Sequence, residues 1–358
     1  MTILVTTAIL ALTLTQQAPT GSSSLEASLR EAIRSSGAEV AVAYRTLDGG
    51  DEVLIDPDKS FHAASTMKIP VMIEVFRQAS AGTLRLDDSL PIRNEFKSIV
   101  DGSAYKLSEG DDSDTEIYAA VGKTLTLREL CEATITVSSN FATNLLIEKL
   151  GVENIRRTVT RLGADGMQVL RGVEDQKAFD KGMNNTTTAR ALLVVLEKLA
   201  HGKAVNPTAD AEMIEVLKRQ KFNDAIPAGL PAGIAVAHKT GTITRIQHDA
   251  GVVYAERPYT VVLLVRGIQD QKKSKALMAN LSKLIYDASQ GVASRGGGRH
   301  PHRARSARRL EMWRKTCVSR SGASSGSTGI VQPVNGRSAR SSRALRQSNA
   351  SSSRPRTV

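Results

Sequence analysis

Residues 61–76 read FHAASTMKIPVMIEVF and mark the point where the pattern of the sequence changes. From Thr66 to about Ala200 the apolar residues recur at i, i+3 and i+4, the spacing of helices with one buried face. Before this stretch residues 39–47 alternate as in a strand, and after it the sequence returns to strand patterns. The expected strands are 39–47, 52–55, 233–240, 251–256 and 259–267.

Strands at both ends and helices between them predict that the two ends meet in one antiparallel sheet, with the middle folded beside it. Helices expected at 25–36 and from 272 to about 286 would flank this sheet. We therefore predict an α/β fold of the α+β type, with a five-stranded antiparallel sheet and an all-helical lobe at about 66–231. The active site is expected in the cleft between them.

Both ends of the chain differ in composition from residues 25–291, which we expect to form the catalytic domain. Residues 3–14 are an apolar run too short to cross a bilayer but suited to a secretory signal. Residues 1–24 are therefore predicted to be a signal peptide and linker, and the protein to be periplasmic or secreted; a buried first helix is the alternative. Residues 292–358 are rich in Arg and Ser without helical or strand periodicity, which predicts a disordered tail.

The net charge of +12 comes from this tail, which holds fifteen Lys and Arg but one acidic residue. Residues 1–291 contain 33 basic and 35 acidic residues, so the charge predicts no specific nucleic-acid partner for the folded part. Cys131 and Cys317 form no framework of disulfides, and the six histidines show no zinc-ligand spacing. We expect a monomer with no metal, no cofactor and no membrane span.

Ser65 and Lys68 form an S-x-x-K motif at the start of a helical pattern. This spacing puts the hydroxyl and the amine on one helix face, where the amine can take the proton of the hydroxyl. A single such motif is weak evidence, because Ser103 and Lys106 match it in a Gly/Asp-rich loop. A solvated helix face is the alternative.

Two further motifs follow in a fixed order, Ser138-x-Asn140 and Lys239-Thr240-Gly241. Each has an ordinary alternative, a helix cap for the first and a turn for the second. Acyl transfer needs an activated hydroxyl, a proton donor to the leaving nitrogen and donors aimed at the oxyanion. A lysine can act as a base if burial and a second ammonium group lower its pKa. Together the three motifs predict a nucleophilic serine site.

The motifs and the strings around them resemble a class A beta-lactamase, or a close relative among the penicillin-recognising serine hydrolases, over residues 25–290. The resemblance implies that Ser65 is the acylated nucleophile, that Lys68 assists its activation and that Ser138 protonates the lactam nitrogen. It also implies an oxyanion hole from the backbone N–H groups of Ser65 and Thr242. The implied substrate-binding residues are Asn140, Lys239, Thr240, Gly241 and Thr242. The matching strings are FHAASTMKIPVMIEVF, LRELCEATITVSSNFATNLLIEKLG and AHKTGTITRIQHDAGVVY.

The sequence departs from this family in the loop expected to carry the base for deacylation. The family pattern is E-x-x-L-N, and Glu174 occupies the position of its glutamate. Ala178 replaces the asparagine of the pattern, and the loop looks shorter. Asp175 is the rival candidate for the base, and an acidic pair without function is the alternative to both. Because a general base must reach the attacking water, we expect the altered loop to affect deacylation before any other step.

Three smaller departures also produce expectations. Met72 occupies the position of a usual disulfide partner, so Cys131 is expected to be a buried free thiol. The arginine that often binds the substrate carboxylate is absent near Asp249, and Arg245 is a possible substitute. The acidic run at 109–116 is expected to be a solvated flap.

We therefore expect a serine beta-lactamase that hydrolyses penicillins and cephalosporins through an acyl-serine intermediate and confers β-lactam resistance. The alternative enzyme is a penicillin-binding D-alanyl-D-alanine peptidase or an esterase-like hydrolase with slow deacylation. A binding protein that uses acylation for sensing is a third reading, although the tail lacks a recognition module.

Overall fold

The computed structural model describes residues 21–291, which fall within one compact unit. Residues 1–20 of the predicted signal peptide, the predicted tail 292–358 and Cys317 lie outside the described residues. Residues 21–24, predicted as linker, belong to the first helix α1 (Gly21–Ser36).

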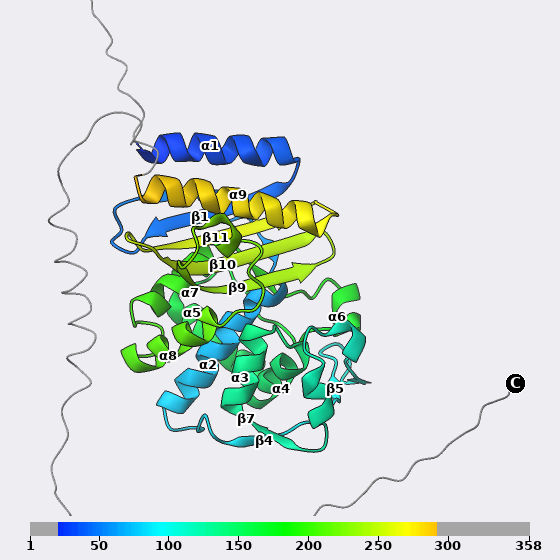
Figure 1. Ribbon diagram of the computed structural model, residues 1–358. Helices are drawn as coiled ribbons and strands as arrows, with labels where there is room; N and C mark the ends of the chain where they lie inside the picture. The colour runs from blue at the N-terminus through cyan, green and yellow to red at the C-terminus, as the bar shows by residue number, and fades with distance from the viewer. Residues whose placement is uncertain (1–20, 292–358) are drawn as a thin grey trace, which may run out of the picture. The chain divides into compact units, whose positions relative to one another are not determined.

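The two ends of the described chain form one five-stranded antiparallel sheet, which confirms the predicted fold class. The strands are β1 (Glu39–Thr46), β2 (Glu52–Ile55), β9 (Ala235–Ile243), β10 (Ile246–Tyr254) and β11 (Tyr259–Arg266). Their order is β2-β1-β11-β10-β9, so the N-terminal hairpin lies beside the three C-terminal strands (Figure 1). The register pairs Val42 with Leu263 and Thr240 with Asp249.

β10 begins five residues before the strand predicted from Gly251. The added stretch contains Gln247, His248 and Asp249, which interrupt the apolar alternation although all three side chains are buried. His248 Nε2 lies 2.9 Å from the backbone oxygen of His62, and burial lowers the pKa of its imidazole to about 4. Partners from elsewhere in the fold therefore allow a polar segment to occupy the middle of the sheet.

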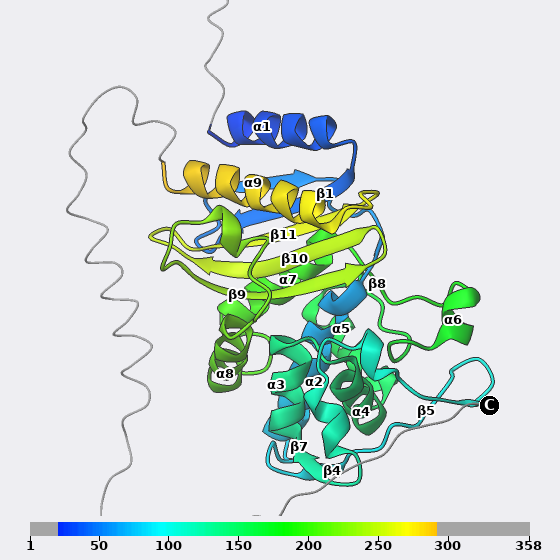
Figure 2. The ribbon, with the colours of Figure 1, turned by 45° about the vertical axis from the view of Figure 1, so that its right-hand side comes forward.

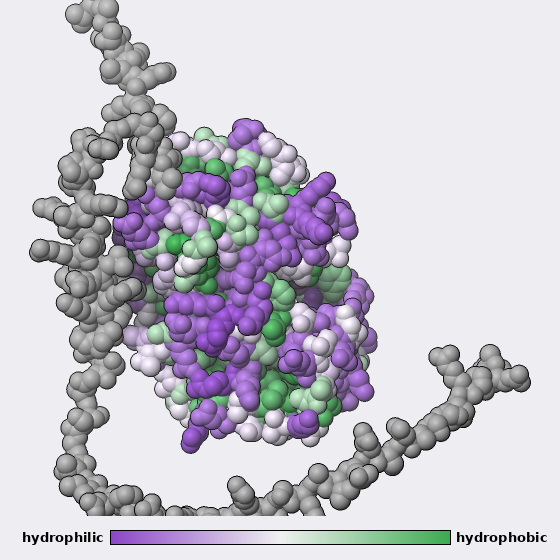
Figure 3. All heavy atoms as spheres, viewed as in Figure 1, coloured by the Kyte–Doolittle hydropathy of each residue, from purple (hydrophilic) through white to green (hydrophobic). Residues whose placement is uncertain are grey.

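Helices cover both faces of the sheet (Figures 1 and 2). On one face α1 and α9 (Gln271–Ser289) pack against the sheet through Leu29, Leu263 and Leu281, all fully buried. Burial of each such leucine contributes about 1.5–3 kcal/mol. The visible surface is a mosaic of hydrophilic and hydrophobic residues without one large apolar area (Figure 3).

The opposite face carries the helical lobe, whose central helix is α2 (Lys68–Ser80). Residues 68–76 are buried without interruption, so α2 is enclosed on all sides and runs through the core of the lobe. The other helices are α3 (Leu127–Thr136), α4 (Asn140–Leu150), α5 (Val152–Leu162), α6 (Gln176–Asp180), α7 (Ala189–Ala200) and α8 (Pro207–Lys218).

Cys131 on α3 is buried and free, as expected, and burial raises the pKa of its thiol to about 12.

Short strands and 3-10 turns connect these helices. The strand pairs are β3 (Phe61–His62) with β8 (Thr186–Thr187), β4 (Ser89–Pro91) with β7 (Thr124–Thr126), and β5 (Phe96–Lys97) with β6 (Ala104–Tyr105). The 3-10 turns are η1 (Ala64–Met67), η2 (Glu109–Asp111), η3 (Glu116–Ala120) and η4 (Pro227–Gly229).

Candidate active site

Ser65 lies on the 3-10 turn η1, where the chain passes from the sheet into α2. Ala64 before it has a φ of 45°, a conformation that L-residues adopt at a cost and that recurs at functional sites. Strand β9 packs directly on this turn. A Cβ at Gly241 would lie 3.1 Å from the Ser65 nitrogen, so the close approach requires glycine there.

Lys68 begins α2, and its ammonium group is fully buried. Its Nζ donates to the Ser138 carbonyl oxygen at 2.6 Å, to Asn140 Oδ1 at 2.8 Å and to Ser138 Oγ at 3.2 Å. Burial lowers the pKa of Lys68 to about 7, while Asp112 and Glu174 oppose this shift. Within residues 21–291 the Ser65 hydroxyl makes no hydrogen bond, and contacts of this kind often tighten only when substrate binds.

Lys239 approaches Ser138 from strand β9. Its Nζ donates to Ser138 Oγ at 2.9 Å and to the Thr240 carbonyl oxygen at 3.0 Å. Burial and the charge of Lys68 hold the pKa of Lys239 well below its usual value. Because the Ser138 oxygen accepts from two amines, its own proton is free to be donated into the cleft.

The backbone around Ser138 explains why its side chain is available. Ser138 has a φ of 60° and lies between α3 and α4. Its neighbour Ser139, with Oγ 3.1 Å from the Ala142 nitrogen, caps α4 instead. The capping alternative therefore applies to Ser139, and the Ser138 hydroxyl contacts both lysines.

The acidic run at 109–116 contributes to this arrangement, so the expectation of a solvated flap is wrong for Asp112. Asp112 is 8% exposed and accepts hydrogen bonds from the backbone N–H groups of Asn140 at 3.0 Å and Phe141 at 2.9 Å. A carboxylate at a helix N-terminus stabilises the helix. Sequence reasoning missed it because an acidic loop carries no periodicity that could indicate burial.

Replacing Asp112 with alanine is expected to lower the free energy of unfolding by about 2 kcal/mol, because two buried N–H groups lose a charged acceptor. The measurement is urea unfolding followed by circular dichroism. Glu109 → Ala, in the exposed part of the same run, is the matched control and should unfold at the wild-type midpoint. Equal midpoints for the two variants would contradict this role.

Two asparagines on one face of α4 hold the loop that carries Glu174. Asn144 Oδ1 accepts from the Val173 nitrogen at 2.7 Å, and its Nδ2 donates to the Val173 oxygen at 3.0 Å. One turn earlier, Asn140 Nδ2 donates to Glu174 Oε1 at 2.6 Å. Partial burial in the cleft raises the pKa of Glu174, although the hydrogen bond from Asn140 opposes the shift.

Asp175, the rival candidate for the base, has a structural position. Its carboxylate is 2% exposed and accepts from Ser98 Oγ at 2.8 Å, the Ile99 nitrogen at 2.9 Å and the Ala178 nitrogen at 3.1 Å. These bonds cap α6 and fasten the loop to the segment before β6. The geometry therefore favours Glu174 over Asp175 as the group available to a water molecule.

Ser65 opens into two cavities, of about 300 Å³ and about 730 Å³. Ser138 and Thr240 line the smaller one, Glu174 lines the larger one, and Thr242 lines both. Arg245 lines neither: it lies in the exposed turn after β9 and donates to the Gly267 carbonyl oxygen. The suggestion that Arg245 replaces a substrate-binding arginine is therefore not supported.

The part of the chain that the structure describes contains no cluster of three or more His, Cys, Asp or Glu side chains able to hold a metal ion. In residues 21–291 no helix combines the length and apolar character needed to cross a bilayer.

Comparisons with known proteins identify the family of the chain. The family model described as the beta-lactamase enzyme family matches residues 24–289. The beta-lactamase of Bacillus licheniformis is 29% identical over 181 residues, which span 49% of this chain and only 58% of that protein. The structure of an ancestral class A beta-lactamase is 27% identical, with a TM-score of 0.64, and the match covers 74% of this chain and 99% of that one. A mutant of PBP-A, solved as an acyl-enzyme complex with penicillin G, is 25% identical, with a TM-score of 0.65 and coverages of 75% and 97%. The chain therefore belongs to the beta-lactamase enzyme family, in the class A group of serine hydrolases that act on β-lactams.

Proposed function

We propose that this protein hydrolyses the lactam amide of penicillins and cephalosporins through an acyl intermediate on Ser65, and that residues 25–291 are its catalytic domain. The observation that carries the proposal is the convergence of Lys68 and Lys239 on the Ser138 hydroxyl, beside a serine that opens into both cavities. Similarity to a PBP-A structure that holds an acyl-enzyme complex with penicillin G supports the covalent step.

In acylation, Ser65 Oγ attacks the lactam carbonyl carbon while neutral Lys68 takes the hydroxyl proton. The backbone N–H groups of Ser65 and Thr242 stabilise the oxyanion that forms. As the C–N bond breaks, the Ser138 hydroxyl gives its proton to the lactam nitrogen. Ser138 recovers a proton from the Lys68 ammonium, which lies 3.2 Å from its oxygen.

The substrate carboxylate binds in the smaller cavity, close to Lys239 and Thr240, where β9 presents a cation and a hydroxyl. Gly241 lets this strand approach the nucleophile turn. Asn140 holds the amide of the acyl side chain toward the larger cavity, which also contains Glu174.

In deacylation, Glu174 removes a proton from a water molecule that attacks the acyl-serine carbonyl. The C–O bond to Ser65 then breaks as this proton passes to Ser65 Oγ, which regenerates the serine hydroxyl and the Glu174 carboxylate. The raised pKa of Glu174 brings this base closer to neutral pH, where a base is most effective. The hydrogen bond from Asn140 keeps the carboxylate at the cleft.

The second candidate function keeps acylation but deacylates slowly, as a D-alanyl-D-alanine peptidase or an esterase would. The observation in its favour is Ala178, which is fully buried where the family pattern has a polar asparagine. The loop therefore lacks the polar side chain of the family pattern at this position.

We further propose that the protein acts as an exported monomer, in the periplasm or outside the cell, and confers β-lactam resistance without nucleic-acid, membrane or metal partners. Expression in a susceptible host tests this. We expect a higher inhibitory penicillin concentration, activity in the released fraction, and a mature N-terminus near residue 21.

The test of the activity itself is to mix the purified protein with a chromogenic cephalosporin at enzyme concentrations that reveal a single turnover. Sustained turnover is the expected result. A single stoichiometric burst would favour the slow-deacylation alternative, and absence of a burst would overturn both.

The acylation rate is expected to rise as the pH is increased through about 7, because Lys68 accepts the serine proton only when it is neutral. Below this pH Lys68 is an ammonium ion and the rate should fall about tenfold per pH unit. The measurement is stopped-flow acylation between pH 5 and 9. Glu174 → Gln serves as the control and should keep an ascending limb, displaced to lower pH because the charge of Glu174 no longer raises the pKa of Lys68, whereas a flat profile would contradict a Lys68 base.

A further inference from the structure

Residues 219–226, between α8 and η4, form one wall of the smaller cavity. Phe222, Asp224 and Ala225 line it, opposite Ser138 and Thr240. Phe222 is 37% exposed, which is high for an aromatic side chain. Contacts that hold this loop therefore determine the shape of the cavity in which the leaving group would lie.

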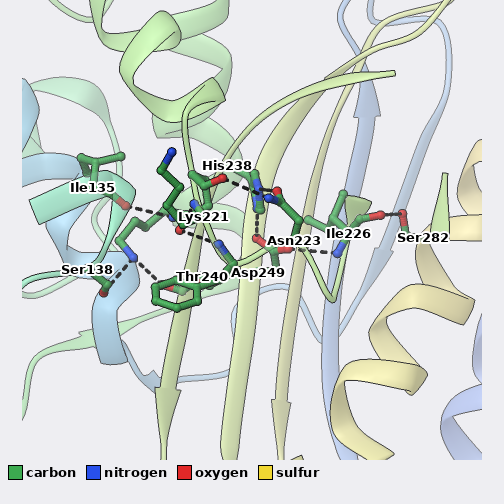
Figure 4. Close-up of polar contacts among 12 residues, drawn as sticks. Ile135, Ser138, Lys221, Asn223, Ile226, His238, Thr240, Asp249 and Ser282 are labelled. Atoms are coloured by element: carbon green, nitrogen blue, oxygen red, sulfur yellow. Dashed lines mark hydrogen bonds and ion pairs between the residues drawn. The ribbon is translucent and has the colours of Figure 1, made fainter. Parts of the chain in front are cut away.

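A buried pair of side chains holds the loop from the side of the sheet (Figure 4). His238, which directly precedes Lys239, is 1% exposed, and its Nδ1 lies 2.8 Å from Asp249 Oδ1 on the neighbouring strand. The other carboxylate oxygen, Oδ2, accepts from the backbone N–H of Ile226 at 2.9 Å. The second ring nitrogen, Nε2, lies 3.1 Å from Asn223 Oδ1.

The orientation of the Asn223 amide is fixed by its own partner. Its Nδ2 donates to the Gln220 carbonyl oxygen at 3.1 Å, so its oxygen faces the imidazole. Both ring nitrogens of His238 therefore face oxygen atoms, one of Asp249 and one of Asn223. Asp249 is fully buried, so this contact and the loop share one enclosed carboxylate.

The same loop is attached at its other end to the helix that leads to Ser138. Gln220 Nε2 donates to the Ile135 carbonyl oxygen at 2.9 Å, and the Lys221 nitrogen donates to the Thr136 oxygen at 3.0 Å. Thr136 ends α3, two residues before Ser138. The loop thus joins the strand that carries Lys239 to the backbone that carries Ser138.

We propose that His238, with Asp249 and Asn223, is a positioning residue that braces residues 219–226 across the cleft and keeps Lys239 in contact with Ser138. The brace serves acylation, which uses that contact, and not deacylation, which uses Glu174 in the other cavity. The proposal rests on the proposed function for its kinetic consequence, whereas the contacts of His238 and the tethered loop are independent of it.

The kinetic test compares three variants in single-turnover acylation and in hydrolysis of the preformed acyl-enzyme. Asn223 → Ala removes an acceptor at an exposed position, so the fold should survive. It is expected to slow acylation by up to about 10²-fold, the effect of a displacement of about 1 Å, and to leave deacylation unchanged.

Asp249 → Asn keeps each hydrogen bond with a neutral ring, because its amide can donate to Nδ1, and should acylate within about tenfold of the wild type. Lys221 → Ala, an exposed side chain of the same loop, is the matched control and should match the wild type.

The structural test is hydrogen exchange of the backbone amides at pH 7. The Ile226 amide should exchange slowly in the wild type and quickly in Asn223 → Ala, because the contact that holds residues 219–226 is lost. Equal slowing of acylation and deacylation, or acylation unaffected by Asn223 → Ala, would overturn the positioning role. If the wild type does not acylate at all, the proposed function fails, and the exchange result alone decides whether the brace exists.

Discussion

Replacement of Ser65 with alanine is expected to lower kcat by about five to six orders of magnitude, the loss seen when a hydrolase is deprived of its serine nucleophile. The covalent route depends on one oxygen, and in residues 21–291 no other hydroxyl lies both on the nucleophile turn and at the junction of the two cavities. The remaining donors can still bind substrate, so the residual rate should not fall to zero. The measurement is steady-state hydrolysis of a chromogenic cephalosporin, with mass spectrometry to show that no adduct forms.

The matched control is Ser103 → Ala, in the second S-x-x-K motif. Ser103 lies beside β6 and donates to Asp101 at 2.7 Å, and Ser103 itself lines neither cavity, although Lys106 of its motif lines the larger one. Its removal should leave kcat within twofold of the wild-type value. Turnover that survives in Ser65 → Ala but not in Ser103 → Ala would contradict the assignment of the nucleophile.

The second large effect is expected for Glu174 → Gln, which should stall the enzyme after acylation. Loss of a general base typically costs about 10²- to 10⁴-fold, and here the loss falls on deacylation alone. The glutamine keeps an oxygen that can accept from Asn140 Nδ2, now 2.6 Å from the glutamate, so the loop should stay in place. We expect a burst of one equivalent of product and a protein mass increased by the acyl group.

Asp175 → Asn separates the two acidic candidates. Its carboxylate caps α6 and bonds to Ser98, so its replacement should lower stability, with little accumulation of acyl-enzyme. Accumulation in Asp175 → Asn together with rapid turnover in Glu174 → Gln would assign the base to Asp175 instead.

The sequence alone predicted the fold class, because the pattern of apolar residues separates strands from helices. The strand patterns at 39–47 and 259–267 and the helical spacing after Thr66 are each visible within a few residues. They led to the sheet that brings the two ends together and to the lobe between its strands. Boundaries were less certain where burial involved polar residues, and β10 was predicted five residues short for that reason.

The candidate site was predictable in its residue types but not in its contacts. The S-x-x-K, S-x-N and K-T-G motifs identify Ser65, Lys68, Ser138 and Lys239, but their spacing cannot show that both amines reach one hydroxyl. The lowered pKa of Lys68 was expected from burial and the second lysine, but burial alone lowers it in the structure, so the contribution expected from Lys239 is not borne out. A pKa depends on surroundings that come from distant parts of the chain.

The sequence by itself therefore determined the elements, the order of the motifs and the chemistry that their side chains can perform. Only the tertiary structure decided that Asp112 binds the start of α4, that Asn144 and Asn140 present Glu174, and that Asp175 is a cap. The physical reason is that periodicity is a local property of the chain, whereas burial, hydrogen-bond partners and shifted pKa values arise between segments that meet only after folding.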